Sequence, residues 1–190
     1  MGKKIILLTE FESLSKEKIL DLIKRADIDS DTVKLIKYFD TLKKQRVPFF
    51  LNKDDLEKIL MWKLKTQYGR QRTIRTLNND NITKSITKLA FEIEHPDKDY
   101  EIELKIGILT SLRGIAVPIA SAILTIIYPY EFAVIDFRNG EVMYGSEKSS
   151  FTVKNYIEYL KKIRELAKKH ELSTQKIDLA MWQYHRENSK

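Results

Sequence analysis

LTSLRGIAVPIASAILTIIYPYEFAVIDFR, residues 109–138, is the stretch from which the fold of this chain can be predicted. It predicts the end of one helix, a sharp reversal at Arg113-Gly114, and a second apolar helix from Ile119 to Leu124. Glycine suits the reversal because it adopts a positive φ at no steric cost. Pro118 suits the first turn of the second helix, where its missing N–H would be unpaired anyway.

A Pro-containing segment, Tyr128 to Ile135, follows this hairpin and ends in a single acid, Asp136. A carboxylate that closes an apolar run can cap the next helix by accepting hydrogen bonds from its first amide groups. The same carboxylate can stabilise positive charge that develops on a substrate. The sequence alone leaves both roles open.

These residues resemble the helix-hairpin-helix DNA glycosylase superfamily, whose pattern is L-x-G-[IV]-G-x-x-x-A, an apolar helix, and a Pro/Gly-containing loop that ends in a catalytic Asp. The matching residues are Leu112, Gly114, Ile115, Ala120 and Asp136. Asp136 lies 18 residues after Pro118, a separation similar to that between the family's reactive hairpin position and its acid. The resemblance covers about 30 residues closely.

The resemblance implies a monofunctional DNA glycosylase that hydrolyses the N-glycosidic bond of a damaged or mismatched base. Asp136 would stabilise the oxocarbenium-like sugar and orient the attacking water. The backbone N–H groups of Gly114, Ile115 and Ala116 would bind a phosphate, with Arg113 adding charge. In the family, hairpin carbonyls also hold a monovalent cation, so K⁺ or Na⁺ is expected at the carbonyls of Leu112 and Gly114. No other cofactor is implied.

Two positions depart from the family pattern. Ala116 replaces the second hairpin glycine, which makes one backbone approach to a phosphate less free. Pro118 occupies the position of the Schiff-base lysine of the bifunctional members, and this excludes lyase chemistry through that position. Lys63 and Lys65 could act as a nonstandard amine nucleophile if they reach the cleft.

The most basic segment runs from Trp62 to Arg75. Its cations are Lys63, Lys65, Arg70, Arg72 and Arg75, and its aromatic side chains are Trp62 and Tyr68. Cations interleaved with aromatic rings predict phosphate contacts with base-stacking platforms. The alternative is a solvated cationic face with Trp62 and Leu64 in the core. We further predict DNA contact by Arg138 and base reading by Trp182, whose neighbours in the last predicted helix are polar.

The composition restricts the partners and reactive groups that this chain can have. A net charge of +7 favours a polyanionic partner, although a lysine-rich proteome would give the same surplus. The chain has no cysteine, which excludes a thiolate nucleophile and an iron–sulfur cluster, and its 3 histidines lack zinc-site spacing. The apolar run Ile5–Leu8 is too short for a signal peptide or a membrane span, so we expect a cytoplasmic, nucleoid-associated protein.

The hydrophobic periodicity predicts an all-α protein. We expect two small helical lobes around a cleft, with the hairpin lobe at approximately 52–136 and the other lobe formed by the N- and C-terminal helices of a single 1–190 unit. Arg138 to Gly140 reads as a loop, and Glu131 to Ile135 is the only candidate strand. Candidate caps Ser149, Ser150 and Thr152 precede a long helix from Val153 to Lys169.

Three functional hypotheses remain at this point. The first is a monomeric glycosylase acting on duplex DNA with a flipped base. The second is a non-catalytic helix-hairpin-helix module that binds DNA or RNA and uses Asp136 only as a cap. The third is an all-α protein-interaction domain whose positive charge is incidental.

Overall fold

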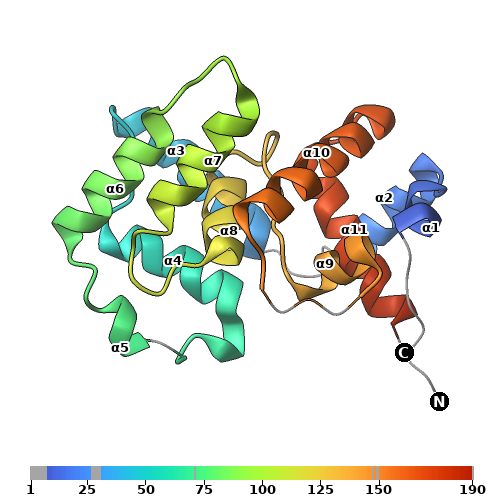
Figure 1. Cartoon of the computed structure of the whole chain (residues 1–190), viewed down its shortest axis with the longest axis horizontal. Helices are drawn as coiled ribbons and strands as arrows, with labels where there is room; N and C mark the ends of the chain where they lie inside the picture. The colour runs from blue at the N-terminus through green and yellow to red at the C-terminus, as the bar shows by residue number, and fades with distance from the viewer. Residues whose placement is uncertain (1–7, 27–30, 71, 147, 149, 190) are drawn as a thin grey trace. The chain divides into compact units, whose positions relative to one another are not determined.

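The computed structural model describes residues 8–26, 31–70, 72–146, 148 and 150–189, and all regular structure within these ranges is helical (Figure 1). The predicted all-α class is therefore confirmed. Residues Phe132 to Ile135 form a buried link without regular structure and not a strand. In the same ranges, no helix combines the length and the apolarity that crossing a lipid bilayer requires.

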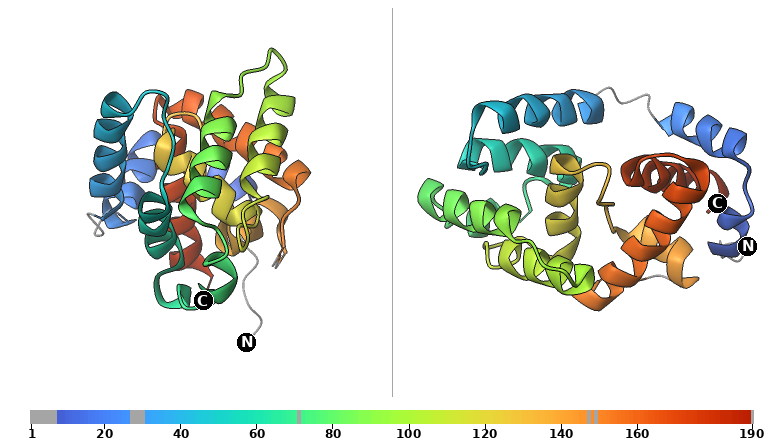
Figure 2. Two further views of the ribbon diagram at one scale, coloured as in Figure 1. Left: turned by 90° about the vertical axis from the view of Figure 1, so that its left-hand side faces the viewer. Right: turned by 90° about the horizontal axis from the view of Figure 1, so that it is seen from above.

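The chain divides into two compact units, and we describe each by itself. The central unit spans Asp31–Ile127. Its elements are α3 (Asp31–Gln45), α4 (Lys53–Leu64), the 3₁₀ turn η1 (Lys65–Gln67), α5 (Arg72–Arg75), α6 (Asp80–Glu92), α7 (Lys98–Leu109) and α8 (Val117–Ile127). Helix α8 is its core, because nine of its residues are buried and it packs against α3, α4 and α7. Helix α6 lies along α7, as Figure 1 and Figure 2 both show.

The second unit consists of the segments before Asp31 and after Ile127. Its elements are α1 (Leu8–Glu12), α2 (Lys16–Ala26), α9 (Phe137–Tyr144), α10 (Val153–His170) and α11 (Thr174–Asn188). Helix α11 packs against α2, α9 and α10, and thereby joins the two ends of the chain. The large side chains of Phe11, Tyr156 and Tyr159 are fully buried in it. We call these two bodies the central unit and the terminal unit.

Polar side chains fix where several helices begin. Asn52 forms a capping box with Asp55 at the start of α4, and Thr152 forms one with Asn155 at the start of α10. Ser173 caps α11 by accepting from the Lys176 amide. Each such cap stabilises its helix by about 1 kcal/mol. The predicted cap at Thr152 is confirmed, whereas the candidate Ser149 lies outside the described residues.

Two sequence-based expectations need correction. Arg138 to Gly140 is not a loop but part of α9, whose C-terminal cap is Gly145 at φ 65°. Position 140 requires glycine because the ring of Phe151 lies against it and would collide with a Cβ atom there. The unit boundaries also differ from the expected 52–136, since α3 belongs to the central unit and Asp136 to the terminal unit.

Candidate nucleic-acid interface and carboxylate site

The hairpin of the central unit joins α7 to α8 through residues 110–116. Gly114 adopts φ 74°, so the predicted positive φ at this glycine is confirmed. The turn is closed by the Ile115 amide, which donates to the Leu112 carbonyl at 3.2 Å. The first bond of α8 follows at once, from the Ala120 amide to the Ala116 carbonyl at 2.9 Å. Pro118 lies in the first turn of α8, as its missing donor requires.

Three backbone amides at this turn are not used by the fold. Within the described ranges, the N–H groups of Gly114, Ala116 and Val117 donate to no protein acceptor. Two of them match the expected phosphate donors, but the third expected donor, Ile115, is used inside the turn and Val117 takes its place. Unpaired amides at the start of a helix are suited to an anion because they combine hydrogen bonds with the helix dipole.

A buried asparagine holds this turn in place. The Asn78 side chain, 4% exposed, accepts from the Arg113 amide at 2.8 Å and donates to the Arg113 carbonyl at 2.9 Å. Asn78 follows α5, so the hairpin is tied to the end of the basic segment. The Arg113 side chain itself is exposed. Sequence analysis missed Asn78, because its partner lies 35 residues away along the chain.

The basic segment presents fewer cations than its composition indicates. Arg70, Arg72 and Lys65 are exposed, and Lys63 is partly buried. Arg75 is only 3% exposed and donates to the Arg70 carbonyl at 2.5 Å and to the Tyr68 carbonyl. The Arg75 guanidinium therefore stabilises the turn, and in this conformation it cannot reach an external phosphate.

The aromatic side chains of this segment already have partners in the central unit. The Trp62 indole donates to the Thr32 hydroxyl at 2.9 Å. The Tyr68 hydroxyl donates to the Glu57 carboxylate, and this hydrogen bond, helped by burial, raises the pKa of Tyr68. The Arg75 guanidinium lies 5.2 Å from the centre of the Tyr68 ring. The base-reading roles of both rings stay predictions.

In the terminal unit, Asp136 caps α9. Its backbone is extended, and its Oδ1 accepts from the amides of Arg138 at 3.0 Å and Asn139 at 3.2 Å. The carboxylate is partly exposed, whereas the four residues before it are buried. The capping role that the sequence allowed is confirmed. Its catalytic role stays a prediction.

A buried polar network fixes the residue next to this cap. The Asn139 amide group donates to Asp178 Oδ1 at 2.6 Å and to the Tyr159 hydroxyl at 3.1 Å. The Tyr159 hydroxyl donates to the same Asp178 oxygen at 2.5 Å. Burial raises the pKa of Tyr159 well above its ordinary value, and the Asp178 charge adds to this, so the hydroxyl keeps its proton. Asn139, Tyr159 and Asp178 thus tie the start of α9 to α10 and α11.

The predicted residues Arg138 and Trp182 lie together in the terminal unit. The Arg138 guanidinium is 5.6 Å from the Trp182 ring centre and 4.8 Å from that of Phe137. Its Nη1 lies 3.5 Å from Nδ1 of His185, whose Nε2 is 2.9 Å from the Glu141 carboxylate. Phe137, Glu141 and His185 were not predicted as site residues. Their signal in the sequence is helical spacing, since Phe137 and Glu141 are four residues apart and Trp182 and His185 are three apart.

The described residues hold no group of three or more His, Asp or Glu side chains that could bind a metal ion. At the hairpin, the Leu112 carbonyl already accepts from the Ile115 amide. A K⁺ or Na⁺ ion there would therefore share that oxygen with a hydrogen bond. The cation at Leu112 and Gly114 stays a prediction.

The candidate residues fall into two sets. The hairpin and the basic segment belong to the central unit, and Asp136, Arg138 and Trp182 belong to the terminal unit. Each set is ordered by its own contacts. Comparison of the chain with known proteins found no matching family model, no matching curated protein and no matching solved structure.

Proposed function

We propose that this chain binds DNA through the hairpin of the central unit and hydrolyses an N-glycosidic bond with Asp136, in the manner of a monofunctional helix-hairpin-helix glycosylase. The observation that carries the proposal is the set of unpaired amides at Gly114, Ala116 and Val117. They lie on a turn with a positive-φ glycine, next to the exposed cation of Arg113. This is the chemistry that a backbone phosphate requires.

Further charge supports the DNA-binding part. Arg70 and Arg72 are exposed in the same unit, and Asn78 joins their segment to the hairpin. The net charge of +7 adds long-range attraction for a polyanion. Phosphate contacts of this kind give affinity without base sequence specificity, and they weaken as salt rises.

The catalytic part rests on Asp136. Breaking the bond between C1′ and the base nitrogen leaves positive charge on the sugar and the electron pair on the departing base. Water then forms the new C1′–O bond, and the proton that it loses neutralises the base. A fixed carboxylate beside C1′ stabilises that charge. The Asp136 carboxylate is held by two amides and partly exposed, which suits this role. Pro118 supplies no amine, so the proposal includes no lyase step through the hairpin.

One observation favours a second candidate, a non-catalytic nucleic-acid-binding module. Oδ1 of Asp136 accepts both amide hydrogen bonds of the α9 cap, which by itself is reason enough for an acid at this position. The two candidates share the hairpin and differ only in turnover.

Asp136→Asn separates them. Asparagine caps helices as well as aspartate does, so this variant keeps the α9 cap and removes the negative charge. We expect single-turnover cleavage of duplexes carrying uracil, hypoxanthine, 8-oxoguanine or an alkylated base, developed with alkali, to be lost in the variant while its urea midpoint is retained. Equal cleavage by both proteins would remove Asp136 from the chemistry. Absent cleavage by the wild type, with tight binding, would leave the binding module.

The binding part has its own test. Arg113→Glu reverses an exposed charge beside the free amides, and Lys44→Glu makes the same change on an exposed face of α3. We expect the Arg113 variant to lose duplex affinity and to flatten the plot of log K against log salt concentration by about one phosphate contact. Equal effects of the two variants would show that the hairpin is not the phosphate site.

A further inference from the structure

Four side chains of the terminal unit form an alternating stack of rings and guanidinium groups. In order they are Phe137, Arg138, Trp182 and Arg186. The ring-centre-to-guanidinium distances along the stack are 4.8 Å, 5.6 Å and 4.8 Å. Two members come from the start of α9 and two from the last turns of α11, which packs against α9. We call this set the aromatic–arginine stack.

Buried side chains support the stack. Arg138 lies against His185, and His185 lies against Glu141; both supporting side chains are buried. The Phe137 and His185 rings are nearly perpendicular, with 6.4 Å between their centres. The Asp136 cap fixes the backbone from which Phe137 and Arg138 project. The stack is therefore ordered before any ligand arrives, which lowers the cost of binding.

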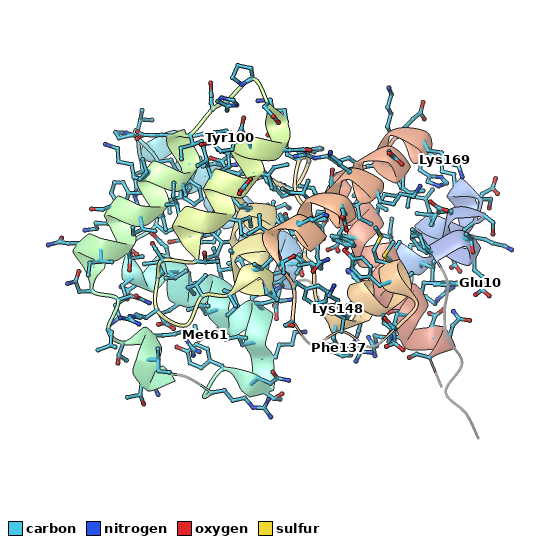
Figure 3. All side chains as sticks on the ribbon, viewed as in Figure 1. Glu10, Met61, Tyr100, Phe137, Lys148 and Lys169 are labelled. Atoms are coloured by element: carbon cyan, nitrogen blue, oxygen red, sulfur yellow. The ribbon has the colours of Figure 1, made fainter. Side chains whose placement is uncertain are left out.

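The ends of the stack are open. Phe137 is 55% exposed at the first residue of α9, where Figure 3 labels it. Arg186 is also exposed. A large exposed ring beside a cation is not needed by the fold, because neither group contributes to the buried core.

We propose that the aromatic–arginine stack binds an unpaired nucleobase and the phosphate next to it, in single-stranded or locally unpaired nucleic acid. A nucleobase adds a further flat ring to the stack at Phe137, and its phosphodiester pairs with a guanidinium. Lipid headgroups and acidic peptides supply the anion but no flat ring, so they use only half of the stack. The inference rests on the proposed nucleic-acid binding and does not need turnover at Asp136.

Tryptophan fluorescence tests the stack directly. The chain has 2 tryptophans, so Trp62→Phe leaves Trp182 as the only reporter. We titrate this protein with single-stranded oligothymidylate and with an oligonucleotide of the same length whose residues are all abasic. Both strands are expected to change the fluorescence of Trp182, whose ring lies close to the guanidinium groups of Arg138 and Arg186, and the abasic strand is expected to bind more weakly.

Phe137→Leu, made in the Trp62→Phe background, removes the flat ring and keeps an apolar side chain. We expect it to weaken oligothymidylate binding about tenfold and to leave abasic-strand binding unchanged. The matched control is Tyr130→Leu, which removes a ring that is 80% exposed in the same unit. Arg186→Gln should reduce the salt slope by about one contact. Circular dichroism and urea midpoints check that each variant is folded.

Each outcome decides between the two proposals. If wild type binds DNA but Phe137→Leu and Tyr130→Leu behave alike, the stacking site is refuted and DNA binding stands. If the effect of Phe137→Leu is equal on oligothymidylate and abasic strands, Phe137 does not stack on a base. If wild type binds neither duplex nor single strand, the proposed function fails together with the stack.

Discussion

Replacing Asn78 with alanine should loosen the hairpin without touching any candidate ligand-binding group. The substitution removes two hydrogen bonds, at 2.8 Å and 2.9 Å, that join the buried Asn78 side chain to the amide and carbonyl of Arg113. Each hydrogen bond of this kind contributes about 1 kcal/mol net, so we expect a loss of about 2 kcal/mol in the free energy of unfolding. That loss lowers the folding equilibrium constant about 30-fold.

Urea unfolding followed by circular dichroism measures this loss. Asn81→Ala is the control, since Asn81 is exposed three residues further along in the first turn of α6. Asn78→Asp refines the test, because aspartate keeps the acceptor for the Arg113 amide but turns an oxygen toward the Arg113 carbonyl. We expect it to be nearly as unstable as Asn78→Ala, and both to bind duplex DNA more weakly at fixed salt. A difference from Asn81→Ala below about 0.5 kcal/mol would refute the reasoning.

Two further substitutions test buried basic side chains. Lys105, 5% exposed, donates to the Ala90 carbonyl at 3.2 Å and the Ile93 carbonyl at 2.5 Å at the end of α6. Lys105→Met should lower the free energy of unfolding in urea by about 2 kcal/mol. An unchanged urea midpoint would contradict this capping role. Burial lowers the pKa of His170, with help from the charges of Lys169 and Lys16, so the unfolded chain takes up a proton that the folded chain refuses as pH falls below about 6.5. Stability should fall from pH 7 to pH 5, and less so in His170→Gln; parallel curves for the two proteins would oppose it.

Helix starts were predictable because their determinants are local. Asn52 precedes an apolar periodic run, and its partner in the capping box is three residues away. Thr152 forms the same box at the start of α10, and Ser173 caps α11 through the amide of the residue three positions further on. A polar side chain next to an apolar stripe is sufficient to place such an end, since both the cap and the stripe are visible within one short window of sequence.

The prediction of a loop at Arg138 to Gly140 failed for a non-local reason. Asn-Gly pairs are typical of turns, because both residues tolerate positive φ. Here Asn139 makes its side-chain bonds to Tyr159 and Asp178, and Gly140 provides the space that the Phe151 ring occupies. Tertiary contacts therefore select the helix over the local turn preference.

The candidate site residues also include some that local sequence determines and some that distant contacts determine. Gly114 and Pro118 follow from local backbone requirements, and the sequence predicted both; the Asp136 cap is also local, and it was one of the two roles that the sequence left open. The contacts that orient these features are not local. Asn78 lies 35 residues from its hairpin partner Arg113, and Asp178 lies 39 residues from Asn139, which follows the α9 cap.

A sequence motif thus identifies which backbone amides could bind a phosphate. Buried polar side chains far away in the sequence hold the turn that carries those amides. This is why Asn78 variants test the proposed interface more sharply than a change at Gly114. A bulky residue at Gly114 strains the turn whatever its function. Loss of the Asn78 contacts keeps the backbone amides of the hairpin and disturbs their orientation. If DNA affinity falls by more than the loss of stability explains, the turn is a binding site.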